Sequence, residues 1–287
     1  MKKEPLASQV FVVLVIAFGW SFLAQIVPTL MVMFGMDNDA LLGNPWYQVL
    51  FLYTEAIGIS GMYLYYHKDN ALIPLRSARP LKSYLLGWLL GLLFFSAIWG
   101  VITGLGGYRL HFVFSNNSIV LVLLFLFGYG VQSMFEELLC RGYVMGYFLK
   151  EKRPLLAVVI NSAFFAFLHI ANPHFDWHAA TGLFLFGVLM SELRLLSHNI
   201  WLSGAVHAAW NFAEGTIFGT VVSGLPNVGL IIKSDNTTTA QMLTGGLFGI
   251  ERSSVSIIAH LVAVIILAFV ILQRKGRERP DQASASD

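Results

Sequence analysis

Long apolar segments constrain the fold of this chain more than any other feature of its sequence. A helix that crosses a bilayer needs roughly 20 apolar residues, and segments of about that length recur along the 287 residues. Hydrophobic residues make up 56% of the chain and charged residues only 12%, whereas soluble domains carry about one quarter charged residues. The sequence therefore predicts an all-α, polytopic membrane protein, because helices satisfy their own backbone hydrogen bonds inside a bilayer.

About eight segments qualify as transmembrane helices. They are residues 8–34, 46–66, 84–105, 119–140, 155–171, 180–193, 200–219 and 255–272. The fourth has no clear end, since apolar residues continue to Phe148, and the sixth is short. The first is too long for a signal peptide and has no small-residue cleavage site. We expect a single transmembrane domain over residues 1–273, followed by a polar cytoplasmic tail over residues 274–287.

The basic residues predict the orientation of the helices. Lys and Arg are enriched in cytoplasmic loops of membrane proteins. With the N-terminus inside, 15 of the 18 Lys and Arg residues lie in inner segments, and only Arg109, Lys233 and Arg252 lie in outer ones. Both termini are therefore predicted to be cytoplasmic. A net charge of +2 gives no support for nucleic-acid binding, and the lone Cys140 excludes an internal disulfide or a multi-cysteine zinc site.

Three of the predicted helices carry polar and ionisable side chains, which are expensive inside a bilayer. An ionisable side chain there costs roughly 2.5–3.5 kcal/mol or more, so it marks a functional site by default. The residues are Glu136, Glu137 and Arg141 in the fourth helix, His169 in the fifth, and His207 and Asn211 in the seventh. Other ionisable residues in or beside spans are Glu55, Glu214 and His260.

Helical spacing separates the two neighbouring glutamates. Glu137 and Arg141 are four residues apart, so they share a helix face and can form an ion pair. Glu136 is turned by about 100° from Glu137 and faces the same way as Cys140, which offers no charge. One carboxylate is therefore expected to be paired within its helix, and the other to be available for another role. Taken alone, the Glu137–Arg141 pair is more typical of a structural than of a catalytic role.

The same spacing places polar side chains together on the other two helices. His207 and Asn211 share one helix face, and Phe165 lies one turn before His169. Three helices can thus direct a carboxylate, two imidazoles and an amide into one cavity. Such groups can activate water, bind a metal or stabilise an oxyanion. Each residue also has a structural interpretation, because single polar side chains often form interhelical hydrogen bonds.

These motifs resemble the CAAX prenyl protease and bacteriocin-processing family, called CPBP or Abi. The family pattern is E-E-x-x-x-R, F-x-x-x-H and H-x-x-x-N on separate membrane helices. The chain matches each position with Glu136, Glu137, Arg141, Phe165, His169, His207 and Asn211. The resemblance covers residues 118–218. It implies an intramembrane endopeptidase that acts on a membrane-associated or lipidated protein or peptide, and the compact size suits a bacterial plasma membrane.

The resemblance also implies a role for each motif residue. Glu136 is expected to activate water, His169 and His207 to hold that water or a metal, and Asn211 to contribute to an oxyanion hole. Glu137, Arg141 and Phe165 are expected to support this arrangement. Two alternatives stay open for metal binding. A catalytic zinc can take His169, His207 and Glu136 as ligands, or a glutamate and a water can act without metal, since the H-E-x-x-H pattern is absent.

Two other functional classes stay open. A non-catalytic protein with this fold would bind a peptide, regulate a partner membrane protein or confer bacteriocin self-immunity, but it has little need of all three motifs. A proton-coupled transporter would use Glu55 and Glu214 as a relay, but the sequence shows neither an internal repeat nor paired broken helices. The substrate, the cleavage site and the oligomeric state do not follow from the sequence.

A second cluster of polar residues follows the fifth predicted helix. His174, Asp176 and His178 have metal-like spacing, but we expect an exposed interfacial loop anchored by Trp177. The predicted boundaries also place Glu136 near the inner end of its helix, whereas His169 lies about 21 Å from the inner surface at 1.5 Å per residue and His207 only about 7 residues into its helix. An extension of the fourth helix toward Phe148 would remove part of this conflict.

Overall fold

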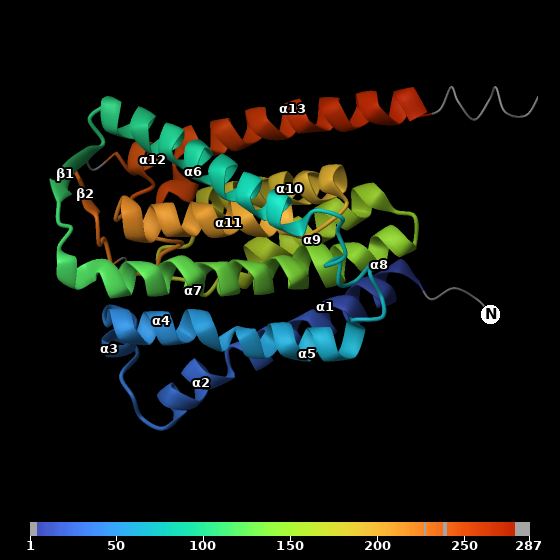
Figure 1. The fold of residues 1–287 in the computed structure, drawn as a ribbon, viewed down its shortest axis with the longest axis horizontal. Coiled ribbons are helices and arrows are strands. Elements are labelled where there is room, and N and C mark those ends of the chain that lie inside the picture. The colour runs from blue at the N-terminus through green and yellow to red at the C-terminus, as the bar shows by residue number, and fades with distance from the viewer. Residues whose placement is uncertain (1–4, 227, 238–239, 279–287) are drawn as a thin grey trace, which may run out of the picture.

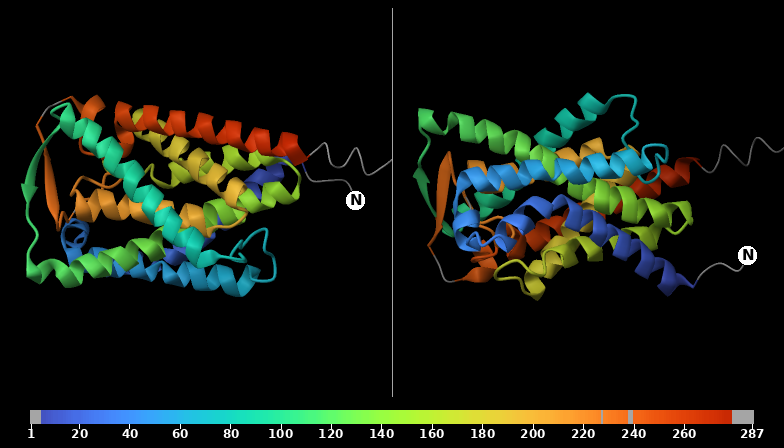
Figure 2. Two further views of the ribbon diagram at one scale, coloured as in Figure 1. Left: turned by 45° about the horizontal axis from the view of Figure 1, so that its top comes forward. Right: turned by 90° about the horizontal axis from the view of Figure 1, so that it is seen from below.

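The computed structural model describes residues 5–226, 228–237 and 240–278 of the chain. Its helices run mainly along the long axis of the molecule (Figure 1). The start of α1 (Leu6–Ala24) and the end of α13 (Ser254–Glu278) lie at one end, which we call the terminal end. The small sheet of β1 (Tyr108–Phe112) and β2 (Ile232–Asn236) lies at the opposite end, the hairpin end. Figure 2 shows the same two ends from further directions.

The remaining elements complete an almost entirely helical architecture. They are α2 (Ile26–Met33), α3 (Asn38–Gly43), α4 (Pro45–Thr54), α5 (Ala56–Tyr66), α6 (Pro80–Gly104), η1 (Asn116–Ser118), α7 (Ile119–Glu137), η2 (Leu138–Val144), α8 (Met145–Lys150), α9 (Pro154–Leu168), α10 (Trp177–Ser197), α11 (Trp201–Phe212), η3 (Ala213–Ile217), α12 (Gln241–Thr244) and η4 (Ile250–Arg252). The all-α fold predicted from the sequence is confirmed.

Five helical segments in the described part of the chain are long and apolar enough to cross a membrane. They are Leu6–Ala24, Pro80–Gly104, Asn116–Lys150, Trp177–Ser197 and Ser254–Arg274. The protein is therefore polytopic, and the number of about eight spans stays a prediction. The sixth predicted span is longer than expected, because α10 has 21 residues. Helix α13 continues to Glu278, so the predicted tail from residue 274 begins as helix, and residues 279–287 lie outside the described part.

The fourth predicted span extends well beyond residue 140. The elements η1, α7, η2 and α8 form one continuous helical segment of 35 residues, Asn116–Lys150. Glu136 therefore lies 14 residues, or about 21 Å at 1.5 Å per residue, from the end of this segment. That depth equals the one predicted for His169, so the extension removes the part of the conflict that concerns Glu136 and His169, whereas His207 still lies near the start of α11. π-Helical turns of this kind are frequent at functional sites.

The first two predicted spans are broken, which the sequence analysis did not anticipate. Gln25 separates α1 from α2, and Glu55 separates α4 from α5. Pro28 explains the first break, because its ring clashes with the carbonyl group four residues earlier in a continuous helix. The amide Nε2 of Gln25 donates a hydrogen bond to Glu55 Oε1 at 2.6 Å. The two breaks therefore meet, and they supply the paired broken helices that were not visible in the sequence.

Strands β1 and β2 form an antiparallel pair, with Tyr108 opposite Asn236 and Phe112 opposite Ile232. The sequence analysis placed these segments in outer connections between spans and did not anticipate that they pair as strands. The strands are short, polar and more than 100 residues apart, so neither shows a clear alternating pattern. Their pairing joins the end of α6 to the segment that follows η3.

Small residues allow α6 and α11 to pack closely. A Cβ atom at Gly87 would lie 2.6 Å from the Ala205 Cβ, and one at Gly91 would lie 2.5 Å from the Val206 carbonyl oxygen. Glycine at these positions lets two membrane helices approach each other, as is common in helix packing within bilayers. This contact fixes α11, which carries His207, against the rest of the helical bundle.

Candidate active site

Five of the seven motif residues, namely Glu136, Phe165, His169, His207 and Asn211, line one cavity of about 440 Å³. Its lining includes residues of α7, α9 and α11, as predicted, and residues of the broken N-terminal helices and of two loops at the hairpin end. The carboxyl and imidazole groups in the lining belong to Glu55, Glu136, His169, His207 and Glu251. The sequence prediction that three helices direct polar groups into one space agrees with this arrangement.

Glu136 lies on α7 and faces the cavity with a side chain that is 16% exposed. Its Oε1 accepts a hydrogen bond from Gln132 Nε2 at 2.6 Å. Its Oε2 has no hydrogen-bond partner among the described residues and lies 3.6 Å from His207 Nε2. The expectation that Glu136 has no partner in its own helix was wrong, because Gln132 lies one turn earlier. Oε2 of this cavity-lining residue is nevertheless a buried acceptor without a hydrogen-bond partner among the described residues.

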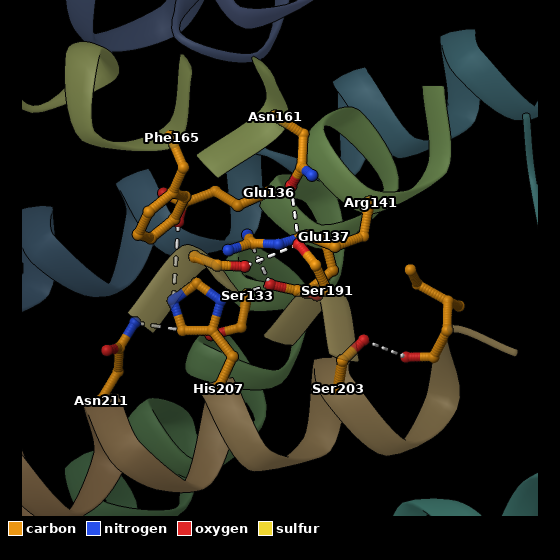
Figure 3. A network of polar contacts seen from close by, with 12 residues as sticks. Ser133, Glu136, Glu137, Arg141, Asn161, Phe165, Ser191, Ser203, His207 and Asn211 are labelled. Carbon is orange, nitrogen blue, oxygen red and sulfur yellow. Dashed lines mark hydrogen bonds and ion pairs between the residues drawn. The ribbon is translucent and has the colours of Figure 1, made fainter. Parts of the chain in front are cut away.

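Glu137 points away from the cavity into a buried ion pair with Arg141. Arg141 Nη1 donates to Glu137 Oε1 at 2.8 Å, and both side chains are fully buried. The same oxygen lies 3.2 Å from His207 Nδ1. The Arg141 guanidinium group also stacks over the Phe165 ring, 4.5 Å from its centroid. The predicted pair is thus present, and it extends to the catalytic candidate His207 (Figure 3).

The contact with Glu137 determines which ring nitrogen of His207 carries a proton. A carboxylate oxygen can only accept a hydrogen bond, so His207 Nδ1 must carry a proton that it donates to Glu137. In the neutral imidazole, Nε2 is then unprotonated and faces Glu136. In the protonated imidazole, the ring bridges both glutamates. His207 is only 3% exposed, so its orientation is set by packing and by this hydrogen bond.

His169 follows the last residue of α9 and also faces the cavity. Its Nδ1 lies 2.9 Å from the Phe165 carbonyl oxygen. A carbonyl oxygen accepts hydrogen bonds, so Nδ1 is the donor and Nε2 of the neutral ring holds a lone pair. The Phe165 ring packs against His169 with centroids 4.9 Å apart, as the spacing of the two residues predicted. His169 can therefore accept a proton or a hydrogen bond through Nε2.

Asn211 joins the same network one turn after His207 (Figure 3). Its Nδ2 donates to Gln132 Oε1 at 3.0 Å and lies 3.5 Å from Ser133 Oγ. Gln132 thus accepts from Asn211 and donates to Glu136, so one side chain positions both residues. The sequence analysis missed Gln132, although its spacing of four residues before Glu136 was a usable signal.

Two carboxyl groups outside the three motifs also line the cavity. Glu55 is 5% exposed, and Glu251 in η4 is 3% exposed. Ser223 Oγ donates to Glu251 Oε1 at 2.7 Å, whereas Oε2 of each glutamate has no hydrogen-bond partner among the described residues. Burial raises the pKa of Glu251. Glu251 was missed because a three-residue 3₁₀ turn has no sequence periodicity.

The two other ionisable residues noted in the sequence, Glu214 and His260, form hydrogen bonds away from the cavity. The buried Glu214 accepts hydrogen bonds from Trp210 Nε1 at 3.1 Å and from the Ile250 backbone N–H at 3.0 Å. His260 contacts the Ser256 carbonyl oxygen of its own helix at 2.8 Å. Neither residue is part of the cavity lining. The interhelical hydrogen bond considered for His260 is thus replaced by one within its helix.

The second candidate cluster, at the start of α10, serves as a helix cap. Asp176 accepts hydrogen bonds from the backbone N–H groups of His178 and Ala179 at 3.1 and 3.0 Å, and Arg252 Nη2 lies 2.7 Å from its Oδ2. Burial by itself raises the pKa of Asp176, but the hydrogen bonds from Arg252 and Ala179 outweigh it and lower that pKa to about 2. These contacts agree with the structural interpretation and give no metal site.

The donor atoms do not fit a three-ligand zinc site. Within the described ranges, no group of three His, Cys, Asp or Glu side chains is arranged to hold a metal ion. His207 Nε2 and Glu136 Oε2 are 3.6 Å apart, but His169 does not complete a ligand set with them. The arrangement of Glu136, His169 and His207 as zinc ligands, considered from the sequence, is therefore absent from this structure.

Comparison with known proteins supports the family suggested by the motifs. Residues 115–213, about a third of the chain, match the family model described as "Type II CAAX prenyl endopeptidase Rce1-like". No curated protein and no solved structure matches the chain in the corresponding searches. The matched segment contains Gln132 and every motif residue of the network. Over this segment the chain is similar to the Rce1-like type II CAAX prenyl endopeptidases.

Proposed function

We propose that the protein is an intramembrane endopeptidase in which Glu136 activates a water molecule to hydrolyse a peptide bond. The observation that carries this proposal is the position of Glu136. Its side chain lines the cavity, and its Oε2, which has no hydrogen-bond partner among the described residues, lies buried 3.6 Å from His207 Nε2. A carboxylate held at one oxygen and free at the other is suited to act as a general base.

The reaction uses groups already in place. Glu136 takes a proton from water while the water oxygen adds to the carbonyl carbon of the scissile bond. The carbonyl oxygen becomes an oxyanion, which hydrogen-bond donors in the cavity stabilise. The C–N bond then breaks, and the proton held by Glu136 passes to the departing nitrogen. The products are a new carboxylate and a new amine.

The neighbouring side chains orient these steps. Gln132 donates a hydrogen bond to Glu136 Oε1 and accepts one from Asn211. It therefore positions both the proposed base and the side-chain amide of Asn211, which is proposed to face the oxyanion. His169 presents Nε2 and His207 lies beside Glu136, so both can hydrogen-bond to the water or, when protonated, to the oxyanion. Glu137, Arg141 and Phe165 fix the position of His207 from behind. No step passes through a metal, because the donor set does not fit one.

The test compares the parent with Glu136→Gln in detergent. Both are incubated with a library of membrane peptides, and new termini are detected by mass spectrometry. Glu192→Gln is the matched control, because Glu192 lies in a membrane helix but does not line the cavity. We expect cleavage by the parent and the control, and none by Glu136→Gln. Cleavage by a well-folded Glu136→Gln protein would refute the role of Glu136.

A proton-coupled carrier is the second candidate, because one observation favours it. The breaks at Gln25 and Glu55 meet inside the cavity and carry an intramembrane carboxyl group, which is a common arrangement in transporters. A carrier would acidify the lumen of proteoliposomes when a peptide gradient is applied, without producing new termini. Glu55→Gln would abolish that signal. Cleavage that persists in Glu55→Gln and stops in Glu136→Gln would favour the protease.

A further inference from the structure

The cavity reaches the surface of the molecule beside helix α2. The lining residues that are exposed on the surface are Gln25, Val32, Asn38, Leu225 and Pro226. Gln25 directly precedes α2, and Val32 lies in its last turn. The other three lie in α3 and in the loop before β2, at the hairpin end. Helix α2 is therefore a side wall of the cavity between these surface positions.

Helix α2 is held to the rest of the bundle only weakly. None of its eight residues is buried by the described part of the chain, and the helix lies at the edge of the bundle (Figure 1). Thr29 is its only polar residue. Apolar side chains gain little when they exchange lipid for a protein surface, because lipid tails are equally apolar. A movement of α2 away from the bundle therefore costs little inside a bilayer.

Helix α1, which precedes α2, is anchored in the bundle. The Phe18 ring packs edge-on against Phe164 and Phe167 of α9, with centroid distances of 5.1 and 5.6 Å. Ala24, the last residue of α1, is fully buried. The change from a buried to an exposed helix thus occurs at Gln25, and α2 can move as a unit relative to α1.

Pro28 makes the junction at Gln25 a hinge. Proline has no N–H group to donate to the Ala24 carbonyl oxygen, and its ring clashes with that carbonyl group in a straight helix. The Gln25 side chain is fixed, because its Nε2 donates to Glu55 Oε1 at 2.6 Å and Glu55 is only 5% exposed. The pivot is therefore tied to the interior of the protein, whereas the helix that follows it is not.

A second hinge follows α2 at Gly35. The φ angle of Gly35 is +89°, and a Cβ atom there would meet no described atom within 4 Å. Phe34, Gly35 and Met36 are all exposed. Asp37 then begins a new element, since its side chain accepts a hydrogen bond from the Ala40 N–H at 3.0 Å and caps α3. Glycine with a positive φ ends helices, and such end positions commonly act as hinges.

We propose that α2 is a movable side wall of the cavity, which swings at Gln25 and Gly35 and admits an apolar segment of the substrate sideways from the bilayer. Val32 lies both on the surface and in the lining, so it contacts the segment as it enters. Hydrolysis of the segment rests on the proposed endopeptidase function. The movement of α2 does not, and it can be measured separately.

The movement is tested by distance measurements between spin labels on the full chain in bilayers. Cys140 is the only cysteine and is buried, so Cys140→Ala provides a background without other thiols. Phe127→Cys on α7 is paired with Met33→Cys on α2 or, as the control, with Leu50→Cys on α4, and all three positions are exposed. We expect a broad distance distribution for the Met33 pair and a narrow one for the Leu50 pair. Equally narrow distributions would overturn the proposal.

Pro28→Ala tests the hinge at Gln25. Alanine restores the N–H group that can donate to the Ala24 carbonyl oxygen and removes the ring clash. Since alanine is also the best helix former, the variant should fold at least as well as the parent. We expect the distance distribution between Met33 and Phe127 to become narrower. An unchanged distribution would show that α2 does not pivot at Gln25.

The path of the substrate is tested by photocrosslinking in Glu136→Gln protein, which is expected to hold peptides without cleaving them. p-Benzoylphenylalanine is introduced in place of Val32, which lines the cavity, or in place of Leu30, which does not. The two side chains are 44% and 41% exposed, so the positions differ in their helix face and hardly in exposure. We expect the membrane-peptide library to be captured at position 32 and much less at position 30. Equal yields, or no capture at position 32, would overturn entry past α2.

Cleavage of a long and a short peptide separates the side entrance from the chemistry. A library peptide that spans the bilayer needs the side entrance, whereas a short soluble peptide around the same bond can also enter at the hairpin end. We expect Pro28→Ala to cleave the long peptide about tenfold more slowly, the effect of one extra hydrogen bond in the closed hinge, and the short peptide at an unchanged rate. Equal rates for the long peptide in parent and variant would overturn the gating role. If the parent cleaves neither peptide, the endopeptidase proposal fails, while the spin-label distances and the crosslinks still decide the role of α2.

Discussion

The buried ion pair beside the cavity allows a quantitative test of the site architecture. Arg141 Nη1 lies 2.8 Å from Glu137 Oε1, and neither side chain is exposed. Replacement of Arg141 by Met leaves the Glu137 carboxylate buried without its cation, and loss of one member of such a pair costs about 3–5 kcal/mol. His207 Nδ1 also donates to Glu137 Oε1, so it can compensate in part. We therefore expect the free energy of unfolding to fall by about 3 kcal/mol, the lower end of that range.

The double variant Glu137→Gln/Arg141→Met provides the decisive comparison. It removes both charges, and a glutamine oxygen can still accept the hydrogen bond from His207. Replacement of a whole buried ion pair is often neutral for stability, so the double variant should regain most of what Arg141→Met loses. The assay is SDS-induced unfolding in mixed micelles, followed by circular dichroism. If the double variant is as unstable as the single one, the destabilisation does not come from an unpaired Glu137, and the argument fails.

Three further predictions follow from the site and its surroundings. Gln132→Ala should lower the cleavage rate about 10–100-fold at unchanged folding, because it removes a hydrogen bond of about 1.5–3 kcal/mol to Glu136 and the acceptor of Asn211; full activity would refute the positioning role. Dialysis against EDTA should leave cleavage unchanged, and a loss that zinc restores would show that a metal takes part. The pKa of Asp176 is lowered to about 2, below its usual value near 3.9, so its pair with Arg252 should stabilise the protein fully above about pH 4 and lose this effect as the pH falls toward 2. Comparison of the parent with Asp176→Asn by thermal unfolding from pH 7 to pH 3 checks this, and a stability difference that disappears above pH 5 would contradict it.

The sequence predicted those parts of the site that depend on helical periodicity. The face shared by Glu137 and Arg141 and the contact between Phe165 and His169 follow from a spacing of four residues, and the structure contains both. The predicted roles of Glu136 and His169 in hydrolysis stay predictions. Local spacing is informative here because a helix fixes the direction of each side chain relative to its neighbours.

Features that depend on contacts between distant segments were not predictable in this way. The hydrogen bond from Asn211 to Gln132 joins residues 79 positions apart, and the β1–β2 pair joins segments separated by more than 100. The meeting of Gln25 and Glu55 requires two helices to break at the same depth. Only Pro28 gave a local signal for either break, and a proline in a membrane helix is often tolerated without one.

The residues that line the cavity fall into two groups, those inside residues 115–213 and those outside this segment. The groups proposed to carry out hydrolysis all lie within residues 115–213, the segment that matches the family model. Other lining residues come from outside this segment, including Gln25, Glu55, Glu251 and the exposed Asn38 and Pro226. Hydrolysis needs the first group in a fixed geometry, whereas the shape and charge of the second group decide which segment can enter. Substitutions in the second group should therefore change the set of cleaved peptides more than the rate for a peptide that is already accepted, and exchanging residues 25–55 with those of another family member is the direct way to transfer selectivity.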